Sequence, residues 1–276
     1  MTTMLITDST AYLPDFIVNN YGIKIIPLNV HLPQQDFKEG EGLSNQEYYQ
    51  YLRNNRIFPT TSQPSAGEFL ELFKQLSPGD EALVILISSK LSGTVQSAQI
   101  ACSMLPDDHP PVTIIDSLSA AMGLGFQVIR AAEMLAEGFA VNEIKTEIES
   151  MREAMQIYFM VDDLEYLVRG GRISKLSGIL GNILQLKPIL TVKAGEIVLF
   201  DKVRTTGKAL QRIFDELEKH RHDLHKITVM HVDAPESVQQ LQIKLQADYS
   251  VPIYLVEVGP VIGTHVGPGC LAVIFY

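Results

Sequence analysis

The sequence contains few cysteines and no motif that would use them. Among its 276 residues only Cys102 and Cys270 are cysteine, and they lie far apart without a C-x-x-C partner. A disulfide framework and a zinc site are therefore not predicted, and we interpret both residues as buried thiols. Residues 1–8 contain no basic segment and no cleavable apolar stretch, so we expect them to form the first strand of the fold and not a secretory signal. We expect a cytoplasmic protein.

Basic residues are also scarce. The chain has 22 Lys and Arg against 32 Asp and Glu, a formal net charge of -10, and this balance argues against a nucleic-acid surface. Residues 258–276 are uncharged, but their glycines, prolines and central His265 exclude a convincing membrane helix. With 46% hydrophobic and 20% charged residues the composition is that of a globular protein, and the length is sufficient for two domains.

Strand and helix patterns alternate through residues 1–155. An aliphatic run at 82–87 predicts a central strand, and Pro27 within the apolar alternation of 22–32 predicts an edge strand. Ser65 and Glu68 form a capping-box pattern before an amphipathic helix. This alternation predicts an α/β domain with a doubly wound, mainly parallel sheet.

Residues 156–276 have a different pattern, and we expect a smaller α+β domain with a mixed or antiparallel sheet. The pair Gly170-Gly171 ends a helical turn and presents Arg172, after which Ser174 begins another helix. Ala194-Gly195 predicts a hairpin, and Thr206 is the expected cap of a later helix.

Hydroxyl groups follow three of the predicted parallel strands. The loops are Asp8-Ser9-Thr10, Ser88 to Thr94 and Asp116-Ser117. Ligands of open α/β sheets bind beyond the carboxyl ends of the strands, so these loops form a candidate site. The alternative is that they only cap helices, and this alternative applies first to Thr10 and Ser117.

The segment Gly259 to Gly269 contains four glycines and two prolines. We predict an irregular loop at a sheet edge that presents Thr264 and His265, because such a composition does not favour a regular helix. One imidazole among backbone amides suits an anionic ligand. The alternative is a long hairpin turn in which the histidine only caps a neighbour.

Three classes of enzyme site receive little support from the residues. A serine hydrolase could combine Ser92, His265 and Asp8 or Asp116, but no G-x-S-x-G elbow occurs. Gly123-Leu-Gly125 and Thr206-Gly207-Lys208 lack the further glycines of nucleotide-binding loops. We also expect no metal or cofactor: His220, His222 and His225 end a charged helix, and Asp162-Asp163 lacks a third ligand and more readily caps the following turn.

Six segments, taken together and in order, resemble the DegV family. They are Thr7 to Ala11, Thr61 to Ser65, Ser88 to Thr94, Gly170 to Ile173, Lys187 to Leu190 and Gly259 to Gly269. The resemblance implies a two-domain protein, with domains 1–155 and 156–276, that holds a long-chain fatty acid in a tunnel between them. The second domain would contribute the lid of this lipid site. It further implies a non-catalytic subunit of a fatty acid kinase system, in which a partner kinase uses ATP to convert the bound carboxylate to an acyl phosphate.

The same resemblance implies the site residues. Thr61, Ser92, Gly93 and His265 would bind the carboxylate, and Arg172 and Arg204 would form a basic rim or contact the kinase. Burial of a C16 chain contributes roughly 12 kcal/mol at about 0.8 kcal/mol per methylene, whereas a buried carboxylate requires converging donors. The alternative function is an ester or thioester hydrolase that uses Ser92 and His265.

Overall fold

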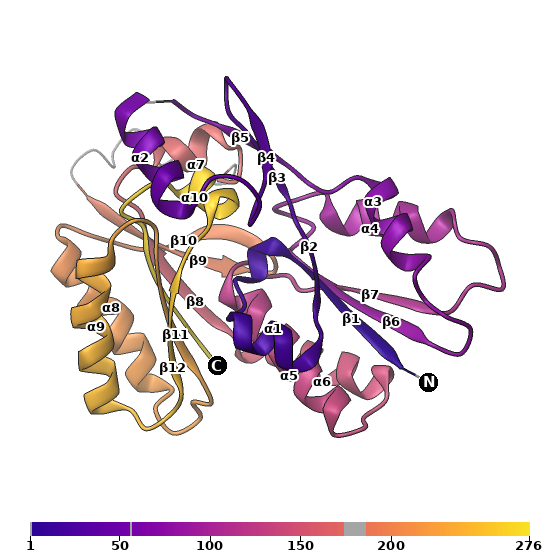
Figure 1. Ribbon diagram of the computed structural model, residues 1–276. Helices are drawn as coiled ribbons and strands as arrows, with labels where there is room; N and C mark the ends of the chain where they lie inside the picture. Colours follow the sequence, from indigo (N-terminus) through magenta and orange to yellow (C-terminus); the bar gives the residue numbers. More distant parts are fainter. Residues whose placement is uncertain (1, 56, 174–185) are drawn as a thin grey trace. The chain divides into compact units, whose positions relative to one another are not determined.

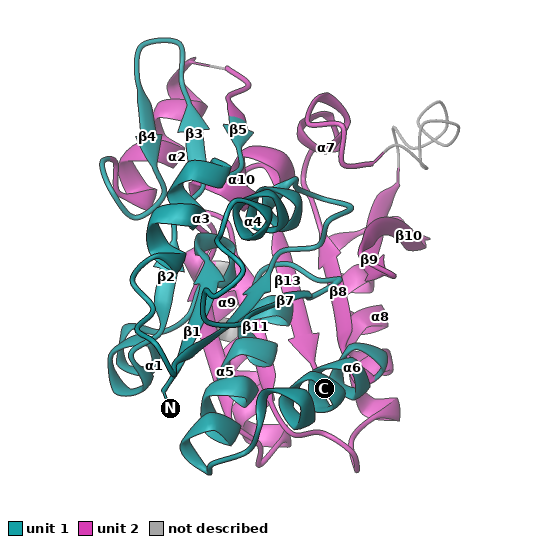
Figure 2. Ribbon diagram, turned by 90° about the vertical axis from the view of Figure 1, so that its right-hand side faces the viewer, with its two compact units in different colours: residues 1–42, 61–153 teal, residues 43–60, 154–276 magenta. Residues whose placement is uncertain are grey.

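The chain forms two compact units. The computed structural model describes residues 2–55, 57–173 and 186–276. Unit 1 consists of Met1–Gly42 and Thr61–Glu153, and unit 2 of Leu43–Thr60 and Ala154–Tyr276 (Figure 2). The boundary between Glu153 and Ala154 lies close to the predicted domain boundary after residue 155. The assignment of Leu43–Thr60 to unit 2 differs from the prediction. Unit 2 is also not the smaller of the two.

Unit 1 contains a four-stranded sheet in the order β2-β1-β6-β7, with all three pairs parallel. Its strands are β1 (Thr3–Asp8), β2 (Lys24–Ile26), β6 (Glu81–Leu86) and β7 (Val112–Asp116). The aliphatic strand β6 is central and β2, which ends just before Pro27, lies at the edge. Both predictions are confirmed.

Helices cover both faces of this sheet. On one face, alternate β6 residues Ala82, Val84 and Leu86 share a hydrophobic cluster with α3 and α4. On the other, α5 contacts β1 and β6 and lies beside α1 (Figure 1). This is the doubly wound arrangement that the sequence predicts. The helices of unit 1 are α1 (Asp15–Tyr21), α3 (Ala66–Phe73), α4 (Thr94–Ser103), α5 (Met122–Ala136) and α6 (Val141–Ala154), with a 3-10 turn η1 (Ser9–Ala11).

A second, three-stranded sheet has the order β4-β3-β5. Its strands are β3 (Asn29–His31), β4 (Asp36–Lys38) and β5 (Thr60–Ser62). Shortly after β5 the predicted capping box is present, since Ser65 Oγ accepts from the Glu68 amide and the Glu68 carboxylate accepts from the Ser65 amide. The sheet and this cap together fix the path of residues 60–68.

Unit 2 contains a mixed six-stranded sheet in the order β10-β9-β8-β13-β11-β12, in which only β11 and β12 are parallel. The hairpin turn at Ala194 and Gly195, with φ of 49° and 83°, is confirmed. The strands are β8 (Gln156–Met160), β9 (Lys187–Lys193), β10 (Glu196–Val203), β11 (Ile227–His231), β12 (Ile253–Glu257) and β13 (Leu271–Phe275).

One face of this sheet packs against α8 and α9, whose apolar residues share a single core cluster with strands β8, β9, β11 and β13. The cap of α8 is Thr205, whose Oγ1 accepts from Lys208, and not Thr206 as predicted. The helix predicted from Ser174 lies outside the described residues. The described helices of unit 2 are α2 (Asn45–Asn55), α7 (Glu165–Arg169), α8 (Thr206–Lys219), α9 (Pro235–Asp248) and α10 (Pro260–Val266).

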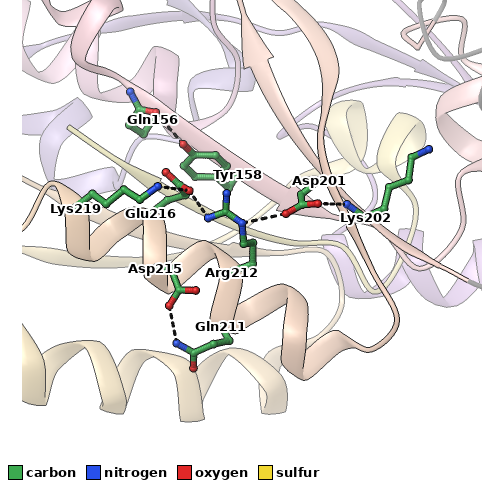
Figure 3. Close-up of polar contacts among 9 residues, drawn as sticks. All are labelled: Gln156, Tyr158, Asp201, Lys202, Gln211, Arg212, Asp215, Glu216 and Lys219. Atoms are coloured by element: carbon green, nitrogen blue, oxygen red, sulfur yellow. Dashed lines mark hydrogen bonds and ion pairs between the residues drawn. The ribbon is translucent and has the colours of Figure 1, made fainter.

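A polar network fastens α8 to the sheet (Figure 3). Arg212 Nε donates to Asp201 of β10 at 3.0 Å, and its Nη1 forms an ion pair with Glu216 one helical turn later. Lys219 Nζ also reaches Glu216, at 2.8 Å. Burial works against ionisation of Glu216, but the hydrogen bonds from Lys219 and Arg212 lower its pKa. The Glu216 carboxylate is therefore charged and paired.

Candidate functional site

Two hydroxyl-rich motifs of unit 1 meet at the start of α4. A Cβ atom on Gly93 would lie 2.7 Å from Nε2 of Gln63, so the Gln63 side chain packs directly over this glycine. Gln63 belongs to the Thr61 to Ser65 segment, and Gly93 is the N-cap residue of α4. The structure thus brings together two motifs about thirty residues apart in the sequence, and both contribute predicted site residues.

The predicted donors of unit 1 lie around this contact. The half-buried Ser92 hydroxyl shares a hydrogen bond of 2.8 Å with Thr94 Oγ1, and the Ser92 amide donates to Ser88 O at 3.1 Å. Gly93, the N-cap residue of α4, has no side chain that could accept hydrogen bonds from the first amides of the helix. Thr61 is half-buried and lies in β5. Hydroxyls beside the amide end of a helix form a suitable environment for an anionic oxygen.

The other hydroxyl-rich loops are occupied by local bonds. Asp8 is fully buried and accepts hydrogen bonds from Ile87 N at 2.7 Å and from Thr10 N at 3.0 Å. Burial raises the pKa of Asp8, and these hydrogen bonds only partly oppose that effect. Asp116 accepts from Leu118 N at 2.9 Å, and Ser117 Oγ accepts from Ser119 N at 3.1 Å. Asp8 thus ties its loop to the end of β6, and Asp116 orders the loop that follows β7.

In unit 2, His265 lies against the Gly170-Gly171-Arg172 turn. A Cβ atom on Gly170 would overlap Nδ1 of His265, so the close approach requires glycine at position 170. The Arg172 Nη1 donates to Gly170 O at 2.5 Å. Burial, reinforced by the positive charge of Arg172, lowers the pKa of His265 to about 4. At neutral pH this pair therefore combines a neutral imidazole with a cation.

The glycine-rich segment around His265 is a helix, so the predicted loop is wrong. Pro260 occupies the first turn of α10, where a missing amide hydrogen costs nothing. Gly267, with φ of +77°, ends the helix, and a Cβ atom there would lie 2.5 Å from the Tyr166 ring. Gly259, Pro260 and Gly267, which argued against a helix, instead mark its start and end, and Gly263 lies within it.

Helix α2 holds α10 in place, a role that the sequence analysis missed. Tyr49 Oη donates to Val258 O at 2.7 Å and to Gly259 O at 2.9 Å. The Tyr48 hydroxyl bonds to Thr264 Oγ1 at 2.6 Å, and that hydroxyl donates to Pro260 O at 2.7 Å. Thr264, predicted to be presented to a ligand, is buried in this bond chain instead. No local signal indicates a partner more than 200 residues away.

Arg204 and the histidines predicted not to bind a metal lie on either side of α8. Arg204 is exposed between β10 and α8. His220 packs against Phe275 and His225 stacks on Tyr276. Within residues 2–55, 57–173 and 186–276, no group of three or more His, Cys, Asp or Glu side chains could hold a metal ion. None of the helices in these ranges is long and apolar enough to cross a membrane.

The sequence and the fold were compared with those of known proteins. A family model described as "Uncharacterised protein, DegV family" matches residues 2–276. A DegV domain-containing protein of Listeria innocua is 39% identical over 97% of this chain and 95% of its own length. The crystal structure of DegV, a fatty acid binding protein from Bacillus subtilis, matches with a TM-score of 0.93 and 36% identity over 100% of this chain and 99% of that one.

A structure from Thermus thermophilus described as fatty acid binding of a DegV family protein gives a TM-score of 0.91 with 34% identity. It covers 100% of this chain and 99% of that chain. The likeness therefore extends over both units. The chain belongs to the DegV family.

Proposed function

We propose that this protein binds a long-chain fatty acid and presents its carboxylate to a partner kinase for ATP-dependent phosphorylation. The observation that carries the binding step is the likeness, over the full length and above 30% identity, to DegV structures described as fatty acid binding. In this phosphorylation the protein acts as a carrier in the cytoplasm and contributes no catalytic group. The transfer of the terminal phosphoryl group of ATP to the carboxylate, which yields an acyl phosphate and ADP, belongs to the kinase.

For the head group we propose Thr61, Ser92 and the Gly93 amide of unit 1 together with His265 of unit 2. The chemistry of each half supports this assignment. In unit 1, Ser92 and the Gly93 amide lie at the amide end of α4, which favours a negative oxygen. In unit 2, a His265 pKa near 4 leaves the imidazole neutral, so it donates one hydrogen bond without adding charge.

Arg172 supplies the positive charge that the neutral His265 lacks. The Arg172 guanidinium acts on the His265 ring within unit 2, so its charge lies beside the proposed head-group donor. We assign Arg172 to the basic rim that meets the kinase or the transferred phosphate. Arg204 is the second rim residue, exposed at the start of α8.

Mass spectrometry of the purified protein tests the central proposal. We expect a long-chain fatty acid in an organic extract of the protein, and uptake of oleate or palmitate after delipidation. The apolar tail supplies most of the binding free energy, at about 0.8 kcal/mol per methylene. A protein that yields no acyl species and takes up neither fatty acid does not have this function.

The kinase step requires a separate measurement. Arg172→Ala should retain most of the fatty acid affinity while acyl phosphate formation with the partner kinase decreases, because a rim charge acts on docking more than on burial of the tail. Equal losses of lipid affinity and of thermal stability would instead assign Arg172 to the support of its own turn.

A further inference from the structure

Three side chains of the small sheet in unit 1 form a continuous hydrogen-bond relay. Ser62 Oγ lies 2.9 Å from His31 Nε2, and His31 Nδ1 lies 3.0 Å from Asp36 Oδ1. The three residues come from β5, β3 and β4 respectively. His31 and Asp36 are direct cross-strand partners in the register of β3 and β4. A hydroxyl, an imidazole and a carboxylate in this order are the elements of a nucleophile, a base and the group that orients the base.

One assignment of hydrogens satisfies every bond in the relay. A carboxylate only accepts, so the hydrogen of a neutral His31 ring lies on Nδ1 and points to Asp36. Nε2 is then an acceptor, and the Ser62 hydroxyl donates to it. Asn29 Nδ2 donates to Ser62 Oγ at 3.3 Å, which adds a dipole that stabilises negative charge on this oxygen. The bonds thus favour removal of the Ser62 proton by His31.

We propose that Ser62, His31 and Asp36 form a catalytic relay that hydrolyses carboxylic esters through an acyl-serine intermediate. Ser62 Oγ attacks the ester carbonyl carbon while its proton passes to His31 Nε2. The C–O bond to the alcohol then breaks, and the alcohol leaves with that proton. A water molecule, deprotonated by His31, attacks the acyl-serine, which releases the carboxylic acid and restores the Ser62 hydroxyl.

The relay is not required to hold the sheet together. Backbone pairing fixes β3 against β4 at Asn29, Val30 and His31, and the strand order places β5 beside β3. Ser62 and His31 are both partly exposed, so a small ester can reach the nucleophile and its base. The Asp36 side chain is 70% exposed, so solvent screens its pairing with His31. We therefore expect slow turnover, with Asp36 contributing the least of the three.

This relay differs from the hydrolase that the sequence suggested. That alternative used Ser92, whose hydroxyl bonds to Thr94 Oγ1 in unit 1. The Ser62 hydroxyl bonds directly to an imidazole of its own unit. The inference also goes beyond the proposed carrier function and does not depend on it, because a short-chain ester needs no site for a long acyl chain.

Ester hydrolysis by the full chain tests this inference, with p-nitrophenyl butyrate as the probe and buffer hydrolysis subtracted. We expect His31→Gln to lower the rate by about 10²-fold or more, the usual range for general-base assistance, and Ser62→Ala to lower it at least as much because it removes the nucleophile. Asp36→Asn should lower it by less than about tenfold because of its exposure. The matched controls are Ser77→Ala, His222→Gln and Asp107→Asn, which change exposed residues of the same three types. These variants should retain the wild-type rate.

Covalent labelling gives a second readout that does not depend on a folded variant. A fluorophosphonate probe should attach to the wild-type protein, and peptide mass spectrometry should place the adduct on Ser62. The inference is overturned by an adduct on another serine, by no adduct at all, or by a Ser62→Ala rate within twofold of wild type. Loss of hydrolysis with undiminished oleate binding would separate this activity from the carrier function.

Discussion

The phenol of Tyr49 fills the space next to Gly263 in which any other residue would carry its Cβ atom. Tyr49 lies on α2 and Gly263 in the middle of α10, so the absence of one side chain allows the two helices to meet. The Tyr49 hydroxyl then reaches the carbonyl oxygens of Val258 and Gly259, just before α10 begins. The contact therefore requires glycine at position 263, although glycine has a low helix propensity.

Gly263→Ala should destabilise unit 2 by about 1 to 3 kcal/mol, because the added methyl group displaces the buried Tyr49 ring. Chemical denaturation measures this change. Gly207→Ala in helix α8 is the matched control, since a Cβ atom on Gly207 would meet no heavy atom within 4 Å. The control should be neutral or slightly stabilising. Equal stability of the two variants would show that Tyr49 adjusts without cost.

Removal of single donors should weaken fatty acid binding if the proposed head-group site is correct. Thr61→Val, Ser92→Ala and His265→Gln should each lower the affinity by about tenfold or somewhat more. A lost hydrogen bond to a buried charge costs about 1 to 3 kcal/mol, and about 1.4 kcal/mol corresponds to a tenfold change in the dissociation constant. Fluorescent fatty acid titration provides the measurement, and Ser103→Ala on the same helix as Thr94 is the control. Unchanged affinity in all three variants would place the carboxylate elsewhere.

Arg172→Gln should raise the pKa of His265. Burial is the larger cause of the low value near 4 and persists in the variant, so the pKa should move toward 6.5 without reaching it. Titration of the His265 ring signals by NMR gives the result. Arg169→Gln, on the neighbouring turn, is the control and should leave the value unchanged. A His265 pKa that is the same in Arg172→Gln and wild type would exclude the charge effect.

The same imidazole makes the stability of unit 2 depend on pH. Its pKa near 4 in the folded state is below the ordinary 6.5, so between these values the unfolded chain binds a proton that the folded chain does not. Stability should therefore fall as the pH decreases from about 6.5 to about 4, by up to about 1.4 kcal/mol per pH unit. Denaturation of wild type and His265→Gln across this range isolates the effect. Parallel curves for the two proteins would contradict it.

Arg212→Ala should destabilise unit 2 by about 1 to 3 kcal/mol, because Glu216 is largely buried and would lose its ion pair with Arg212 while keeping the one with Lys219. The Arg212 guanidinium also lies 4.8 Å from the centre of the Phe200 ring, and this contact would be lost as well. Gln211→Ala is the control, because its exposed side chain bonds to Asp215 on the same helix. That change should stay within about 0.5 kcal/mol in thermal or chemical unfolding.

The features that could be predicted from the sequence depend on residues close together in the chain. The Ser65 and Glu68 cap, the turn at Ala194-Gly195 and the aliphatic strand 82–87 each carry their own signal within a few positions. Helix α10 carries no such local signal, because Gly263 is explained by its contact with Tyr49, which lies 214 positions earlier in the sequence. The same holds for His31, Asp36 and Ser62, whose relay depends on how three short strands associate.

Strand β13 has a consequence for the order in which the protein can be made. It is the last of the described strands in sequence but lies inside the sheet of unit 2, bonded to β8 on one side and β11 on the other. All residues of unit 1 precede Ala154, so this unit can fold while the ribosome is still translating unit 2. Unit 2 can complete its sheet only after β13 has been synthesised up to Phe275. Until then α2, made early, lacks the partners at Val258 and Gly259 that hold it. A stalled or truncated chain would therefore carry one finished unit and one with its central strand missing.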